Sequence, residues 1–80
     1  MKKELVLAVA MAIKYIRKSR DMSQELLAEK SGLDRTYISG VERGIRNITL
    51  DSLEQIINAL DVDVKDFFAV VSDKINELHN

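Results

Sequence analysis

Proline is absent from all 80 residues of this chain, and only three residues are glycine. This feature limits the fold more than any other, because the frequent turns of an all-β fold are made largely of these two residues. Hydrophobic residues make up 46% of the chain and charged residues 31%, which is typical of a globular protein rather than a disordered segment. We therefore expect an all-α fold and, at this length, a single compact domain over residues 1–80.

Residues that could support catalysis are scarce. The chain has no cysteine, which excludes a disulfide-stabilised scaffold and a cysteine-based zinc site. Its single histidine cannot form a histidine-rich metal site. The sequence contains no glycine-rich phosphate loop and no nucleophile–base set. We expect no enzymatic activity, no cofactor and no metal.

Apolar residues at helical spacing, separated by cap and stop residues, predict five helices. Each of the last four follows a residue that can cap its first turn, namely Ser23, Asp34, Thr49 and Asp63. Gly32 and Gly44 can adopt the left-handed conformation that ends a helix. The expected helices cover residues 3–20, 24–31, 35–43, 50–60 and 64–78. In the fourth, one apolar face consists of Leu50, Leu53, Ile57 and Leu60.

The N-terminus imitates a secretory signal, with a basic start, Met1-Lys2-Lys3, and an apolar run from Leu5 to Ile13. Glu4 places a negative charge before the run, and the apolar stripe of Leu5, Val9, Ile13 and Ile16 continues beyond it. Cleavage would cut one amphipathic helix in two. The run is also far shorter than the roughly 20 residues of a membrane span. We expect a cytoplasmic protein that does not associate with membranes.

Charge is unevenly distributed along the chain. Residues 1–47 hold ten Lys/Arg and six Asp/Glu, a balance of +4, whereas residues 48–80 hold two Lys and seven Asp/Glu, a balance of −5. This asymmetry indicates a polyanionic partner on one side of the protein. Chance fluctuation of charge in a small domain is the alternative.

The fifth helix carries more apolar residues than the terminal helix of so small a domain requires. Exposed apolar surface usually marks an interface, so we expect a homodimer formed by the C-terminal helices, about residues 50–78. The residues expected at that interface are Leu53, Ile57, Val64, Phe67 and Phe68. The alternative, that Phe67 and Phe68 close the core of the monomer, applies to at least one of the two.

Residues 24–43 have the spacing of a DNA-binding helix-turn-helix. Ala28 is small enough to let two helices cross closely, and Gly32 permits the turn between them. The residues expected to lock this pair onto the first helix are Leu27, Leu33, Ile38 and Val41. In the second helix of the pair, the opposite face holds Thr36, Ser39, Gly40 and Arg43.

Glycine inside a helix costs about 1 kcal/mol relative to alanine, and close approach to another surface would justify Gly40. The major groove, about 12 Å wide, admits one helix of this size. We interpret this face as one that reads DNA; an ordinary solvated face is the alternative.

The chain resembles the Cro/CI-type (XRE) helix-turn-helix regulators, whose DNA-binding fold is that of lambda repressor. Within that family, Leu33–Gly44 and Arg46–Leu50 are most similar to the controller proteins of type II restriction–modification systems. Those proteins are small dimeric activator–repressors of their own operon. Phage repressors and solitary regulators carry similar recognition helices, so the sub-family stays open.

The resemblance implies roles for individual residues. The residues placed to read base edges are Arg35, Thr36, Ser39 and Arg43. The residues placed to hold the DNA backbone are Gln24, Tyr37, Arg46, Asn47 and Ser52. Arg17 and Glu42 match a structural ion pair that braces the recognition helix. Gln24 matches a position that contacts phosphate and also braces that helix. Asp21 stands where such proteins often carry glycine, and aspartate tolerates the left-handed region better than most residues. Tyr37 could instead belong half to the core, and Asn47 could simply form a loop.

These observations predict a sequence-specific, homodimeric regulator that binds double-stranded DNA at a near-palindromic operator. Autoregulation and control of a restriction–modification operon are the finer expectations, with RNA polymerase as a further candidate partner. The alternative from another class is a protein-interaction module, such as an antitoxin-type partner with the same fold.

Overall fold

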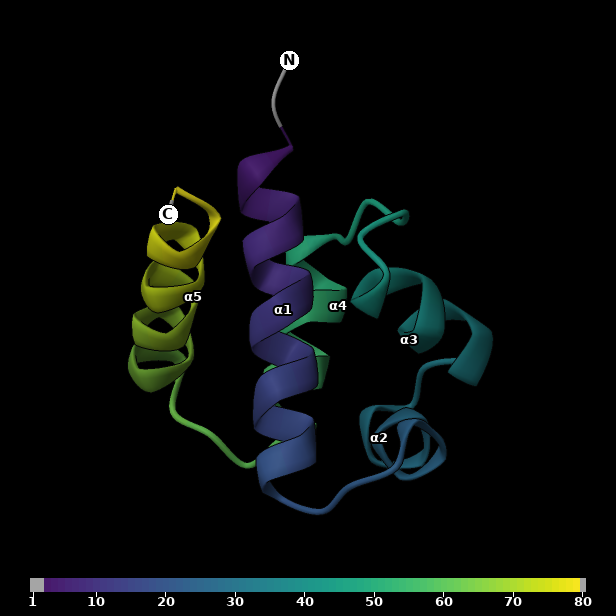
Figure 1. Cartoon of the computed structure of the whole chain (residues 1–80). Helices are drawn as coiled ribbons and strands as arrows, with labels where there is room; N and C mark the ends of the chain where they lie inside the picture. The colour runs from purple at the N-terminus through teal and green to yellow at the C-terminus, as the bar shows by residue number, and fades with distance from the viewer. Residues whose placement is uncertain (1–2, 80) are drawn as a thin grey trace.

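The computed structural model describes residues 3–79, which form five α-helices and no strand (Figure 1). Met1 and Lys2, part of the signal-like N-terminus, lie outside the described residues. The helices are α1 (Glu4–Ser19), α2 (Gln24–Ser31), α3 (Arg35–Glu42), α4 (Leu50–Ala59) and α5 (Val64–Leu78). Every helix end lies within one residue of the position expected from the sequence, so the all-α prediction is confirmed.

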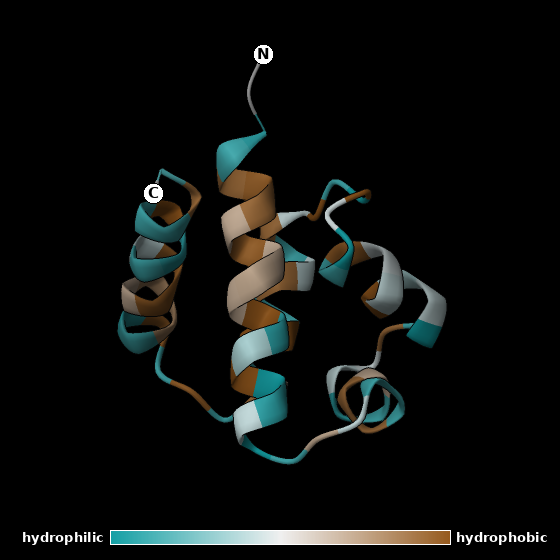
Figure 2. Ribbon diagram, in the orientation of Figure 1, coloured by the Kyte–Doolittle hydropathy of each residue, from teal (hydrophilic) through white to brown (hydrophobic). Residues whose placement is uncertain are grey.

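Helix α1 occupies the centre of the molecule (Figure 1). Helix α5 runs antiparallel along one side of α1, while α2 and α3 lie on the other side and α4 lies behind. Hydrophobic residues cover the side of α5 that faces α1, and polar residues cover its outer side (Figure 2). None of the helices in residues 3–79 is long and apolar enough to cross a membrane.

Three of the four expected caps form as hydrogen bonds of the first turn. The backbone amides of Leu26 and Ser52 donate to the hydroxyls of Ser23 and Thr49, each at 3.0 Å. Asp63 accepts from the amide of Lys65 at 3.0 Å. The exception is Asp34, which has the extended backbone of a cap residue but makes no side-chain cap hydrogen bond.

Four of the helices are followed by a residue in the left-handed conformation. The φ angles of Gly32 and Gly44 are +73° and +71°, as expected, and Asp21 adopts +54° in place of the usual glycine. Asp61, with a φ of +56°, was not anticipated, although it follows α4 as Asp21 follows α1. Because such residues turn the chain sharply, the connections between helices stay short.

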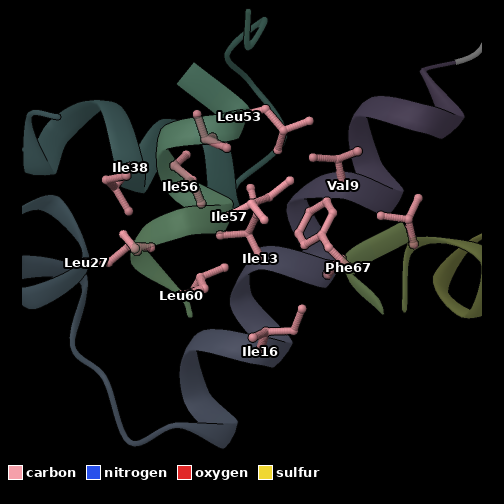
Figure 3. Packing of buried hydrophobic residues seen from close by; sticks show 14 of the residues in the cluster. Val9, Ile13, Ile16, Leu27, Ile38, Leu53, Ile56, Ile57, Leu60 and Phe67 are labelled. Carbon is pink, nitrogen blue, oxygen red and sulfur yellow. The ribbon is translucent and has the colours of Figure 1, made fainter. Parts of the chain in front are cut away.

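A single hydrophobic core joins all five helices (Figure 3). Its largest fully buried side chains are Ile13, Leu27, Ile38, Ile56, Leu60 and Phe67. Burying a side chain of this size contributes about 1.5–3 kcal/mol. Since Leu27 belongs to α2 and Ile38 to α3, both helices of the helix-turn-helix are fixed to the same core as α1 and α5.

Two residues predicted to lie on buried helix faces are exposed. The exposed fractions are 60% for Leu5 and 83% for Leu50, each in the first turn of its helix, where no neighbouring helix covers it. The apolar face of α4 is instead completed by Ile56, which is fully buried beside Leu53 and Ile57.

The burial of individual residues also corrects the expected dimer interface. Phe67 is fully buried and closes the core of the monomer, so its assignment to an interface was wrong. Leu53 and Ile57 are also buried, with exposed fractions of 6% and 2%. Val64 and Phe68 remain available for an interface, with exposed fractions of 47% and 43%. Neighbouring residues of a helix point about 100° apart, so Phe68 faces outward although Phe67 faces the core. The two rings contact each other edge to face, with their centroids 5.3 Å apart.

Candidate nucleic-acid interface

The turn between α2 and α3 depends on the backbone conformation of Gly32. A Cβ atom added there would meet nothing within 4 Å, so the left-handed φ, rather than crowding, favours glycine. The amide of Leu33 donates to the carbonyl of Ala28 at 3.1 Å and fixes the direction in which the chain leaves α2. Ala28 is itself buried, as expected at a close helix crossing.

Helix α3 has one buried and one exposed face, as predicted. Ile38 and Val41 are buried in the core. Arg35, Thr36 and Arg43 are exposed, with Ser39 half-buried. The accessible surface of α3 and its C-terminal end therefore offers two guanidinium groups and two hydroxyls, a set that can donate hydrogen bonds to base edges and phosphates.

Gly40 departs from this pattern, because it is buried rather than open. The side chain of Arg46 lies over it, and a Cβ added to Gly40 would lie 2.7 Å from the Arg46 Cγ. The expectation that Gly40 lies on the open face was therefore wrong. The surface that approaches Gly40 in this structure belongs to the chain itself.

The predicted ion pair between Arg17 and Glu42 is present and nearly buried. Arg17 Nε donates to Glu42 Oε2 at 2.6 Å and Nη2 to Oε1 at 2.9 Å, with side-chain exposures of 9% and 3%. Arg17 Nη1 also donates to the carbonyl of Met22 at 2.7 Å. The pair joins the last turn of α1 to the last residue of α3, and so fixes the recognition helix against the central helix.

Gln24 takes part in the same network, in line with the bracing role that the resemblance implied for it. Its Nε2 donates to Glu42 Oε1 at 3.1 Å. Glu42 thus accepts hydrogen bonds from both α1 and α2. A half-buried glutamine at the start of α2 is in this way tied to the end of α3.

The residues expected to hold the DNA backbone lie at the ends of α2 and α4, on α3, and on the loop that follows α3. The Arg46 guanidinium stands over the ring of Tyr37, 5.5 Å from its centroid. Tyr37 is half-buried against the core, in line with the alternative weighed from the sequence. Asn47 is exposed on the loop, and Ser52 is half-buried in the first turn of α4.

The charge asymmetry along the chain is only partly reproduced in space, because the exposed acids Glu25, Glu29 and Asp34 lie on the helix-turn-helix. The exposed arginines Arg35, Arg43 and Arg46 belong to α3 and the loop after it. The exposed acids Asp63 and Asp66 lie at the start of α5, on the opposite side of α1 (Figure 1). In residues 3–79 no group of His, Asp and Glu is arranged to hold a metal ion.

Comparison with known proteins finds the same architecture. A helix-turn-helix family model matches residues 13–67. The chain is 53% identical over 55 residues to the control protein C.BamHI of Bacillus amyloliquefaciens, covering 68% of each protein. It is 41% identical over 58 residues to the control protein C.MunI of a Mycoplasma species, covering 71% of this chain and 78% of that protein.

Similarity to a solved structure extends over most of the chain. The restriction–modification controller protein C.Esp1396I, determined as a tetramer in complex with its natural 35 base-pair operator, matches with a TM-score of 0.86 and 49% identity. The match covers 89% of this chain and 93% of that one. The resemblance therefore includes the arrangement of the helices and not only the helix-turn-helix.

Proposed function

This chain belongs to the helix-turn-helix family of XRE-type DNA-binding transcription regulators, and from that premise we propose that it acts as a homodimer on a near-palindromic operator. The observation that carries the proposal is the exposed face of α3. It presents Arg35 and Thr36 while Ile38 and Val41 anchor the helix in the core. A helix fixed in this way can enter the major groove without rearrangement.

Sequence is read, in this proposal, by the first turn of α3. Arg35 can donate two hydrogen bonds to O6 and N7 of guanine, and the methyl group of Thr36 can contact the methyl group of thymine. Ser39, one turn along α3, and Arg43, the residue that caps its C-terminal end, are further candidates for base contacts. The main-chain carbonyl of Ser39 accepts from Arg43 Nε at 3.4 Å, which keeps that side chain near the helix.

Contacts to the DNA backbone are proposed for residues at the edges of α3. Gln24, Tyr37, Arg46, Asn47 and Ser52 make up this set. Such contacts fix the register of the protein on the duplex and carry no sequence information directly. They come from four segments of the chain, namely α2, α3, the α3–α4 loop and α4.

The C-terminal helices, about residues 50–78, are the proposed dimerisation surface. Leu50, Val64 and Phe68 are exposed around a shallow apolar hollow that Leu53 and Ile57 also line. A self-complementary contact of this patch gives a two-fold dimer, and a two-fold dimer binds a near-palindrome. The two copies of α3 would then lie about 34 Å apart, one turn of the duplex.

The biological role that fits this similarity is control of a restriction–modification operon, with autoregulation of the regulator's own gene. C.BamHI and C.Esp1396I, both similar to this chain, are controller proteins. We assign the chain no catalytic step and a cytoplasmic location, where operator DNA is accessible. RNA polymerase would be a further partner if the bound dimer activates transcription. A restriction endonuclease gene and a methyltransferase gene beside this gene would support the controller role.

The proposal is tested by selecting binding sites from a random duplex library and measuring gel shifts on the enriched sequence. We expect a near-palindromic site whose affinity falls steeply with salt, since each neutralised phosphate contributes about −0.9 to the slope of log affinity against log salt. With roughly two to four charged contacts per subunit, the slope lies between about −4 and −7 for a dimer. No enrichment at low salt would refute DNA reading and favour a protein-interaction module.

A further inference from the structure

The middle of the recognition helix is occupied by a residue without a side chain, and a side chain from outside the helix fills the space. The position of a Cβ on Gly40 lies 2.7 Å from Cγ, 3.5 Å from Nε and 3.6 Å from Cδ of Arg46. Those three atoms are the stem and first guanidinium nitrogen of one arginine. Gly40 thus forms a seat along which the Arg46 side chain lies.

Two further features hold Arg46 on this seat. The ring of Tyr37, one helical turn before Gly40, stands 5.5 Å from the guanidinium carbon, within the range of a cation–π contact. The backbone also turns back toward α3 after it ends. The amide of Ile45 donates to the carbonyl of Gly40 at 3.1 Å and that of Gly44 to the carbonyl of Val41 at 3.0 Å. This pair of hydrogen bonds, with Gly44 in the left-handed conformation, fixes the direction of the loop that carries Arg46.

We propose that Gly40 is a positioning residue for DNA binding, because it provides the seat that holds Arg46 beside the base-reading face before DNA arrives. The proposal rests on the DNA-binding function proposed above. An arginine loses considerable rotamer freedom when it is immobilised at an interface, and a side chain already held in place loses less on binding. The Gly40 seat therefore contributes affinity without any contact between Gly40 and DNA.

The competing explanation is that glycine lets the DNA itself approach α3 at this position. That reading requires the α-carbon of Gly40 to be accessible from outside. In the structure Gly40 is buried, and the Arg46 stem lies between it and solvent. A substitution that adds a methyl group to Gly40 therefore displaces Arg46 first.

The test combines Gly40→Ala and Arg46→Ala, singly and together, on the selected duplex, with Kd measured by fluorescence anisotropy. Alanine is a better helix former than glycine, so Gly40→Ala should not lower the Tm. We expect Gly40→Ala to weaken binding about two- to ten-fold, the range for ordering one long side chain. In the Arg46→Ala background, the same change should leave the Kd unchanged within error.

Each other result overturns the inference in a distinguishable way. Equal losses from Gly40→Ala in both backgrounds would mean that Gly40 meets DNA directly. If the wild type binds the duplex and Gly40→Ala binds it with the same Kd, the seat has no effect on DNA binding. Failure of the wild type to bind any duplex would refute the proposed function itself.

An NMR measurement on the free wild-type protein does not depend on how the variants fold. The seat predicts cross-peaks from the Arg46 Cγ and Cδ protons to the Gly40 α-protons and to the Tyr37 ring. Their presence supports the seat, and their absence overturns it.

Discussion

Removal of the Glu42 carboxylate should unfold this domain more effectively than any surface substitution. The carboxylate accepts two hydrogen bonds from Arg17, at 2.6 and 2.9 Å, and one from Gln24 at 3.1 Å. In Glu42→Ala the Arg17 guanidinium stays nearly buried but keeps only the Met22 carbonyl. Breaking a buried pair by removing one partner costs about 3–5 kcal/mol, because the remaining charge is uncompensated.

That loss is large against the whole stability of the domain. A chain of this length has a total unfolding free energy of about 4–12 kcal/mol. For a domain of this size each kcal/mol lowers the Tm by about 4–8 °C, so we expect a fall of at least about 12 °C. Circular dichroism during heating and urea titration will measure the change. The urea concentration at the midpoint of unfolding should fall, while the slope of the free energy of unfolding against urea concentration stays constant.

Two control variants distinguish the cost of leaving a buried charge unpaired from the cost of losing an ion pair in general. Glu77→Ala breaks the ion pair between the half-buried Lys74 and the exposed Glu77, and should lower the free energy of unfolding by less than about 1 kcal/mol. The double replacement of Arg17 and Glu42 by methionine removes both charges and should recover much of the loss, since a buried pair can be exchanged for apolar residues at little cost. A loss below about 1 kcal/mol for Glu42→Ala would refute the assignment of this pair as a brace.

Three further predictions follow from the same geometry. Arg35→Ala should make the free energy of binding to the selected operator less favourable by about 1–3 kcal/mol, and that to random duplex by much less, as measured by gel shift. Equal losses on the two DNAs would show that Arg35 contacts phosphate instead of bases. Phe68→Asp should give monomers in sedimentation while the circular dichroism spectrum stays unchanged. Phe67→Ala should instead lower the free energy of unfolding by about 3–5 kcal/mol and leave dimerisation of the folded fraction intact. A wild-type protein that sediments as a monomer at high micromolar concentration would contradict the dimer. Ser23→Ala should lower the free energy of unfolding by about 1 kcal/mol in urea titration, and Asp34→Ala by clearly less, because the Ser23 side chain caps its helix and that of Asp34 does not. Equal losses for the two variants would contradict this assignment of the caps.

The helices could be predicted closely because their ends are set by local chemistry. A cap such as Ser23 or Thr49 needs only the amide of the first turn, and both form that hydrogen bond. Gly32 and Gly44 end helices because their backbone adopts a left-handed conformation that few other residues tolerate. These interactions lie within a few residues of one another, so the sequence contains all the information that places them.

Side-chain environments that depend on tertiary packing could not be predicted in the same way. Phe67 and Phe68 are adjacent and chemically identical, and only the way in which α5 packs on α1 decides that Phe67 points inward. The sequence showed a costly glycine at position 40 but not the surface that approaches it. That surface is Arg46, six residues further on, and its path depends on the turn at Gly44.

The dependence of α3 on tertiary contacts explains how so short a helix can read DNA. It has eight residues, fewer than the about 12–15 at which an isolated helix becomes even marginally stable, and Gly40 weakens it further. Its conformation must therefore come from its neighbours. Ile38 and Val41 hold it to the core, and Glu42 binds Arg17 and Gln24. Because these contacts exist before DNA is present, the free energy of binding need not include the cost of forming the helix.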